Sequence, residues 1–242
     1  MDRFFCSRER WGEGEALLDG EEWHHAVRVM RKKAGDVVEV FDGSGRVARG
    51  EVEEVSKSEL RVRLGEILFV EKEGPEVCLV VAIPKGKTME LIVQKAVELG
   101  VTRIQPLVTA NTVVRLAGEE RVEKARKWQR VALEACKQCG QNWLPVVEEV
   151  RGFEEWLGEF EGGEAVMGSL GKGAFPLKDV LASWKEVERV SALVGPEGDL
   201  SEGERQAAEA KGFAPADLGG IVLRVETACL YLMSCLRFSL SG

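Results

Sequence analysis

The stretch VSALVGPEGDLS, residues 190–201, decides the fold class of this chain. Its first five residues are apolar or small, which is typical of a strand buried on both faces of a parallel sheet. Gly195 and Gly198 follow in a loop, where glycine lets the backbone approach a ligand closely. Ser201, with Glu204 three residues later, is a capping box that begins a helix. This order indicates an α/β domain, with either a ligand site or a plain tight turn between strand and helix.

The same alternation of strands and helices extends over the chain from residue 77 onward. Continuous apolar runs predict strands, and apolar residues at helical spacing predict helices. The predicted strands are 77–83, 103–108, 165–168 and 190–194, and the predicted helices are 88–99, 121–139, 201–211 and 226–238. We expect Thr88 to be the N-cap of the first of these helices. The pattern predicts an α/β domain with a mostly parallel sheet.

The first part of the chain instead favours a small β-barrel module. Apolar and polar residues alternate on either side of the turn residues 42–45, which indicates a hairpin. Gly43 and Gly45 also match the start of a dinucleotide fingerprint, but the chain continues as a strand where that motif needs a helix. The predicted elements are strands at 36–41, 46–52 and 60–64 and a short helix at 21–31. The predicted domains are 1–70 and 77–242, joined by the charged linker 71–76.

Composition excludes several classes of protein. The chain has 242 residues, of which 45% are hydrophobic and 31% charged, an ordinary globular balance. The N-terminus lacks the apolar core of a signal peptide, and no apolar run approaches the roughly 20 residues of a membrane span, so we expect a cytoplasmic protein. His24 and His25 are the only histidines, which excludes most histidine-based mechanisms. Cys136 and Cys139 lack the second pair that a zinc site needs, so no metal is expected.

Charge leaves the question of a nucleic-acid partner open. A net charge of −8 counts against a dedicated nucleic-acid binder. Basic residues nevertheless cluster at 28–33 and at 121–130, where they could contact phosphates or form solvated helix faces. Lys85 and Lys87 stand in a stretch that resembles part of a P-loop, but Val81 occupies the position of the required glycine. These two lysines could contact RNA phosphates or simply be exposed.

A second unusual loop is DLGGIVLRVETA, residues 217–228. Arg224 and Glu226 stand there among apolar residues, at the start of the last predicted helix. Buried charges are costly unless they are paired or used. The loop therefore predicts either a ligand site or an internal Arg–Glu salt bridge without chemistry.

These two loops resemble the signature loops of the SPOUT class of methyltransferases. The chain as a whole resembles one family of that class, the bacterial 16S ribosomal RNA uridine-N3 methyltransferases. The matching segments are 3–5, 24–31, 35–36, 94–101 with Pro106, 195–198 and 218–228. Their order over two domains makes the resemblance specific.

The resemblance implies an N-terminal PUA-like RNA-binding domain and a C-terminal SPOUT domain with a trefoil knot. It implies methylation of N3 of a uridine in 16S ribosomal RNA of the small subunit, with S-adenosylmethionine as cofactor, by a homodimer. The cofactor would lie in a crevice between three loops. The implied cofactor-binding residues are Leu170, Gly171, Gly195, Pro196, Glu197, Gly198, Leu218, Gly219 and Leu223.

The chemistry of the implied reaction assigns roles to three charged residues. We expect Arg224 to stabilise the charge that develops on the uracil carbonyls, and Glu226 to orient Arg224. Glu197 is an alternative acceptor for the N3 proton. The expected RNA-binding residues are Arg3, His25, Arg28, Arg31, Lys32, Lys85, Lys87, Arg126, Lys137, Gln138 and Gln141.

Three positions depart from the pattern of the family. Asp199 stands where the family has the second residue of a Gly-Gly pair, Lys137 where it favours a glutamate, and Gln141 near an expected arginine. The changes at 137 and 141 leave open a SPOUT enzyme that acts on a different RNA. The acidic net charge leaves open a non-catalytic RNA-binding or ribosome assembly factor.

Overall fold

The computed structural model describes residues 1–171 and 173–240. The chain forms two compact units. The N-terminal unit comprises residues 1–73 and 136–144, and the C-terminal unit comprises residues 74–135 and 145–242. The end of helix α3 (Glu119–Cys139) and the loop after it therefore belong with the N-terminal unit.

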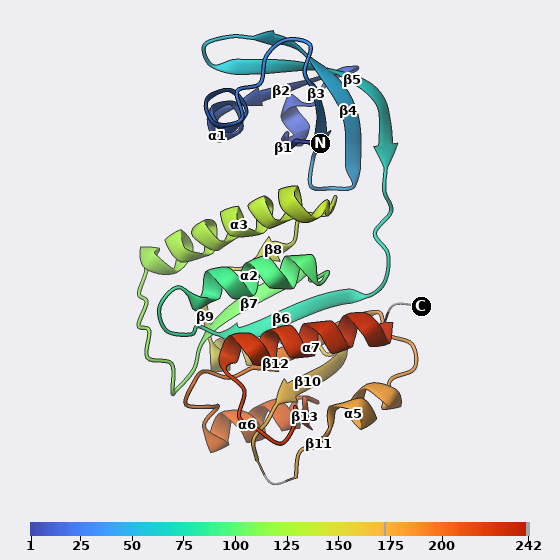
Figure 1. Cartoon of the computed structure of the whole chain (residues 1–242). Helices are drawn as coiled ribbons and strands as arrows, with labels where there is room; N and C mark the ends of the chain where they lie inside the picture. The colour runs from blue at the N-terminus through green and yellow to red at the C-terminus, as the bar shows by residue number, and fades with distance from the viewer. Residues whose placement is uncertain (172, 241–242) are drawn as a thin grey trace. The chain divides into compact units, whose positions relative to one another are not determined.

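The N-terminal unit is built on a five-stranded sheet with the order β1-β3-β4-β5-β2 (Figure 1). Its strands are β1 (Arg3–Phe5), β2 (Glu15–Asp19), β3 (Val37–Phe41), β4 (Arg46–Val55) and β5 (Glu59–Phe69). Strands β3 and β4 pair in antiparallel fashion, which confirms the predicted hairpin. A short 3-10 helix η1 (Arg8–Arg10), helix α1 (Gly20–Trp23) and a π-helical segment η2 (His24–Val29) complete the unit. Alternate strand residues, among them Leu18, Val40 and Val62, form its core.

The glycines of the β3–β4 turn make room for the segment 142–144. The Gly45 N–H donates to the Asn142 carbonyl at 3.1 Å, and the Leu144 N–H donates to the Gly43 carbonyl at 2.9 Å. Gly45 has a φ of +98°, and a Cβ there would lie 2.8 Å from the Trp143 ring and from the Val70 carbonyl oxygen. The pattern that imitates a dinucleotide fingerprint is thus a turn that accepts a neighbouring loop.

The C-terminal unit is built on a sheet whose neighbouring strands, as far as they are described, all pair in parallel. The strand order is β11-β13-β10-β12-β6-β7-β8, and β9 also pairs with β7. The strands are β6 (Glu76–Ala82), β7 (Arg103–Val108), β8 (Val146–Val147), β9 (Arg151–Gly152), β10 (Glu164–Gly168), β11 (Phe175–Pro176), β12 (Arg189–Val194) and β13 (Ala214–Asp217). The predicted mostly parallel sheet is confirmed.

Helices cover this sheet. Besides α3 they are α2 (Thr88–Glu98), α4 (Phe153–Gly158), α5 (Leu177–Ser183), α6 (Glu202–Ala210) and α7 (Val225–Leu240). Helices α2 and α7 lie side by side (Figure 1). Helices α4 and α6 pack on alternate strand residues such as Val80 and Leu193 through Trp156 and Ala208.

The helix starts test two sequence predictions. The capping box of α6 is confirmed, because the Glu204 N–H donates to Ser201 Oγ and the Ser201 N–H donates to the Glu204 carboxylate. The prediction of Thr88 as an N-cap is wrong: α2 begins at Thr88, and Lys87 occupies the N-cap position without a side-chain cap hydrogen bond. Gly86 and Lys87 form a turn, with a φ of +70° at Gly86, that leads directly into the helix, so Thr88 is its first residue and not the residue before it.

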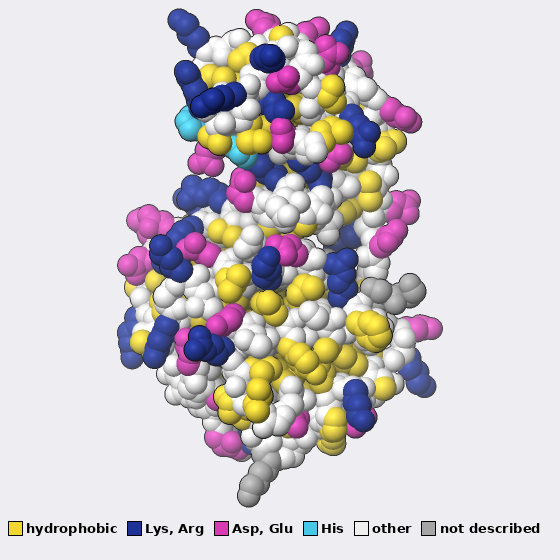
Figure 2. Space-filling model, viewed as in Figure 1, with side chains coloured by type: hydrophobic (Ala, Val, Ile, Leu, Met, Phe, Trp, Pro, Cys, Tyr) yellow, Lys and Arg dark blue, Asp and Glu magenta, His cyan; other side chains and the backbone are white. Residues whose placement is uncertain are grey.

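Apolar side chains gather on the surface of the C-terminal unit over α7 (Figure 2). Tyr231 is 44% exposed and Phe238 is 88% exposed on that helix, and Leu91 of α2 is 43% exposed. Within residues 1–171 and 173–240, none of the helices combines the length and the apolar character that a bilayer crossing requires.

Gly45→Ala should lower the free energy of unfolding of the N-terminal unit by about 2–4 kcal/mol. The new Cβ would require an unfavourable φ and would also clash with Trp143. Gly14→Ala is the matched control, since Gly14 has a φ of +79° and open space around it, and it should cost about 1 kcal/mol. Urea denaturation followed by tryptophan fluorescence measures both, and equal costs would contradict a role for the close approach.

Candidate functional site

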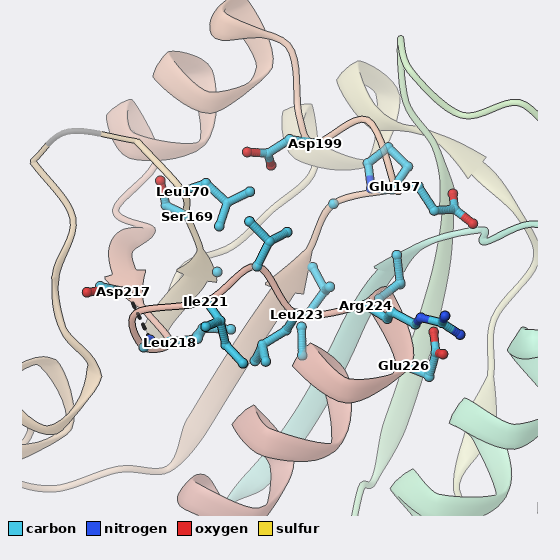
Figure 3. A pocket seen from close by; sticks show the side chains of 18 of the residues that line it. Ser169, Leu170, Glu197, Asp199, Asp217, Leu218, Ile221, Leu223, Arg224 and Glu226 are labelled. Carbon is cyan, nitrogen blue, oxygen red and sulfur yellow. Dashed lines mark hydrogen bonds between the residues drawn. The ribbon is translucent and has the colours of Figure 1, made fainter.

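Three loops at the carboxyl edge of the parallel sheet enclose a cavity of about 480 Å³. They follow β10, β12 and β13, and they contribute residues 168–170, 194–197, 199, 217–219 and 221–226 to its wall (Figure 3). Lys85 and Thr88, from the β6–α2 connection, complete the wall. We call this space the three-loop cavity. Its position is the one at which ligands bind in open α/β sheets.

The structure brings together most of the residues that the sequence predicted for a cofactor. Those that line the three-loop cavity are Leu170, Gly195, Pro196, Glu197, Leu218, Gly219 and Leu223. The predicted residues Gly171 and Gly198 do not line it. Sequence reasoning did not single out Ser169, Asp199, Asp217, Ile221 and Val222 as ligand contacts, although they line the cavity too. Four of these five residues stand within the two signature loops, and that position was the signal that could have found them; Ser169 lies outside both loops.

Part of the wall is apolar and closely packed. A Cβ on Gly168 would lie 3.2 Å from Leu218 Cδ1, so a larger residue there would displace this leucine. Ile221 and Val222 are each 75% exposed, and Leu170 is 64% exposed. Exposed apolar side chains around a concave surface are typical of a site that buries a ligand.

Three carboxylates of the wall each accept a backbone N–H. Glu197 Oε1 accepts from Lys85 at 2.9 Å, which ties the β12–α6 loop to the β6–α2 connection. Asp199 Oδ1 accepts from Leu200 at 2.8 Å, and Asp217 Oδ1 accepts from Gly219 at 2.9 Å. These hydrogen bonds hold the loops in shape and leave the second oxygen of each carboxylate for other contacts.

Arg224 and Glu226 are not the buried pair that their apolar neighbours suggested. Arg224 is exposed and Glu226 is half-buried, and neither forms an ion pair with any residue that the structure describes. The reason is that Ile221 and Val222, which precede Arg224, are themselves exposed on the loop. Both charged side chains line the three-loop cavity, and Figure 3 shows them on the same side of it.

The thiol next to this loop is not a nucleophile. Burial raises the pKa of the Cys229 thiol well above its usual range, and the charge of Glu226 raises it further. A thiol with such a pKa stays protonated at neutral pH. Cys229 therefore serves as a small core residue of α7.

Several residues predicted to bind RNA make contacts inside the N-terminal unit. The Arg3 side chain donates to the Gln141 carbonyl at 3.2 Å and to the Asn142 side chain, and its guanidinium stacks over Phe41. Lys137 Nζ lies 2.9 Å from a Glu22 carboxylate oxygen and 3.1 Å from His25 Nδ1. Lys32 pairs with Asp2.

Other predicted RNA-binding residues present their side chains to solvent. Those that are exposed are Arg28, Arg31, Lys85, Lys87, Arg126 and Gln138. Gln141 is half-buried, and its side-chain oxygen accepts from the backbone N–H groups of Asn142 and Trp143.

Parts of both units match known sequence families. Residues 71–237 match the family described as an RNA methyltransferase domain, and residues 18–65 match the RNA methyltransferase PUA domain. The ribosomal RNA small subunit methyltransferase E of Bacillus subtilis is 30% identical, with 98% of this chain and 96% of the relative covered. Its counterpart in Synechocystis is 31% identical, with 93% of this chain and 74% of the relative covered.

Solved structures show the same fold. The ribosomal RNA small subunit methyltransferase E of Neisseria gonorrhoeae, bound to S-adenosyl methionine, superimposes with a TM-score of 0.86 at 28% identity, over 98% of this chain and 97% of that one. A methyltransferase of Legionella pneumophila with the cofactor SAM bound gives a TM-score of 0.90 at 29% identity, over 98% and 97% of the two chains.

Lys137→Ala should lower the free energy of unfolding by about 2–4 kcal/mol, because it leaves the Glu22 carboxylate without its cation. The side chains of Lys137 and Glu22 are only 6% and 14% exposed. Lys127→Ala on the same helix is the matched control, since Lys127 pairs with Glu90 at the surface, and it should cost less than about 1 kcal/mol. Chemical denaturation measures both variants, and a Lys137 cost as small as that of Lys127 would contradict the internal role.

Proposed function

This chain belongs to the ribosomal RNA small subunit methyltransferase E family, and from that membership we propose that it transfers a methyl group from S-adenosylmethionine to N3 of a uridine in 16S ribosomal RNA. The observation that carries the proposal is the three-loop cavity, which gathers seven of the predicted cofactor residues with Arg224 and Glu226. We therefore also propose that the protein acts in the cytoplasm, where small ribosomal subunits are found.

The residues of the cavity fit the proposed cofactor. Leu218, Ile221 and Leu223 offer an apolar surface to an adenine ring, and Gly195 and Gly219 expose backbone groups to its polar edge. The second oxygens of Asp199 and Asp217 suit the positive charges of the methionine part. When bound, the cofactor supplies a methyl group on a sulfonium, which is ready for in-line displacement.

Arg224 is the residue that we assign to the uracil. It is exposed at the three-loop cavity and makes no ion pair among the described residues, so its guanidinium can reach the carbonyl oxygens beside N3. There it stabilises the negative charge that grows as N3 loses its proton. To Glu226, which lines the same cavity, we assign the role of orienting Arg224 when the uracil is bound. Glu197 is the proposed proton acceptor through the oxygen that Lys85 does not engage.

Exposed cations on both units provide contacts to the RNA backbone. Arg28 and Arg31 serve in the N-terminal unit, and Lys85, Lys87 and Arg126 serve in the C-terminal unit. Such contacts hold the RNA without reading its sequence, and they allow an acidic protein to bind a polyanion locally.

Arg224→Ala should reduce methyl transfer to small ribosomal subunits by a factor of about 100 or more. The affinity for S-adenosylmethionine should stay within about twofold, because the lost interaction forms only in the transition state. Incorporation of labelled methyl groups and calorimetric titration measure the two quantities. Arg126→Ala gives the contrast: it should weaken subunit binding and leave turnover at saturating subunit intact. Unchanged turnover in Arg224→Ala would remove this residue from the mechanism.

We also propose that the protein is a homodimer in which a second copy covers the exposed apolar residues of α7. Tyr231 and Phe238 on this helix support the proposal, as do Ile221 and Val222 beside the three-loop cavity. Burial of such side chains drives stable association.

Phe238→Glu should raise the dissociation constant of the dimer by about tenfold or more, because a charge would be buried in the interface. Val37→Glu is the control, since Val37 is a similarly apolar residue, 57% exposed, on the N-terminal unit. Sedimentation equilibrium measures both variants. A wild-type protein that stays monomeric at high micromolar concentration would contradict the proposal.

A further inference from the structure

Asp199 adopts a backbone conformation that its side chain disfavours. Its φ is +60°, and among the described residues other than glycine only Arg31 shares a positive φ. A Cβ makes this left-handed region unfavourable, so the surrounding structure must hold the residue there. The β12–α6 loop forms part of the wall of the three-loop cavity, so the conformation of Asp199 affects the shape of that cavity.

The side chain of Asn111 spans this residue. Its Nδ2 donates to the Gly198 carbonyl at 3.1 Å and to the Asp199 carbonyl at 2.9 Å. These two carbonyls belong to the peptide groups on either side of Asp199. One amide group therefore fixes both peptide planes that define the φ and ψ of Asp199.

Asn111 is itself held by a separate part of the C-terminal unit. It lies in a turn after β7 whose flanking residues, Thr109 and Thr112, are buried and hydrogen-bonded to each other at 2.9 Å. The Ala110 N–H donates to a Glu204 carboxylate oxygen at 2.8 Å, which anchors the turn to helix α6. These hydrogen bonds hold the turn in place, and with it the Asn111 side chain.

The effect of this contact reaches the cavity directly. A Cβ on Gly195, which lines the cavity, would meet Asp199 Oδ1 at 3.2 Å and the Leu200 nitrogen at 3.1 Å, so these residues pack closely. A change in the φ of Asp199 would move its carboxylate away from Gly195. We propose that Asn111 is a positioning residue: it holds Asp199 in the left-handed conformation and thereby shapes the wall that receives the methyl donor. This inference rests on the proposed function only for the identity of the ligand.

A double-mutant cycle tests the proposal. Asn111→Ala should raise the dissociation constant for S-adenosylmethionine about three- to tenfold. In an Asp199→Gly background, the same substitution should change it less than about twofold, because glycine adopts a positive φ without an external support. Asn111→Asp keeps the shape but removes the donor, so it should weaken binding at least as much as Asn111→Ala. An equal factor in both backgrounds, or no effect of Asn111→Ala, would overturn the proposal.

Hydrogen exchange separates this proposal from the proposed function, since it needs no ligand. The Asp199 N–H donates to the Pro196 carbonyl at 2.9 Å, and the Leu200 N–H donates to Asp199 Oδ1. Both amides should exchange faster in Asn111→Ala than in the wild type. A wild-type protein that does not bind S-adenosylmethionine would refute the proposed function alone. The exchange rates would then decide: faster exchange supports the positioning role, and unchanged exchange overturns it.

Discussion

The parallel pairing of β10 with β12 and β13 is the constraint on which the rest of the site depends. Val166 in β10 pairs with Ala192 in β12 and with Ala214 in β13. This register places the carboxyl ends of three strands at one edge, although their residues lie far apart in the chain. The loops that follow must then meet, and together they enclose the three-loop cavity.

The sheet brings the loops together, and polar contacts between the loops then fix their conformation. The Glu197 carboxylate ties the β12–α6 loop to the β6–α2 connection, and Asn111 ties the same loop to the turn after β7. Backbone groups at such an edge have no strand partner, so side chains supply the missing acceptors and donors. In consequence the shape of the cavity depends on residues from five connections of the sheet, those that follow β6, β7, β10, β12 and β13.

The sequence predicted the parts of the fold that carry a local signal. The apolar runs of β6 and β12, the hairpin β3–β4 and the capping box at Ser201 were all readable because neighbouring residues determine them. Strand β13 could not be predicted from the sequence, since Ala214–Asp217 is short and contains a proline. The association of residues 136–144 with the N-terminal unit was equally hidden, because only long-range contacts such as that of Gly45 with Asn142 produce it.

In the candidate site, too, some features could be predicted from the sequence and others could not. Glycines and leucines of the two signature loops pointed to a ligand, and the structure gathers most of them around the cavity. The exposure of Arg224 was not predictable, because apolar neighbours in sequence can themselves be exposed on a loop. The internal ion pairs of Arg3 and Lys137 were not predictable either. The sequence does not show whether a basic residue faces a phosphate or an internal carboxylate.

The most direct test of the account is to map the methyl group that the protein transfers. Small ribosomal subunits that lack the modification are incubated with the protein and labelled S-adenosylmethionine, and the 16S ribosomal RNA is digested and analysed by mass spectrometry. The proposed function predicts one 3-methyluridine at a single position. Incorporation into another base or another RNA would contradict the proposed substrate, and the absence of any incorporation would contradict the proposed activity.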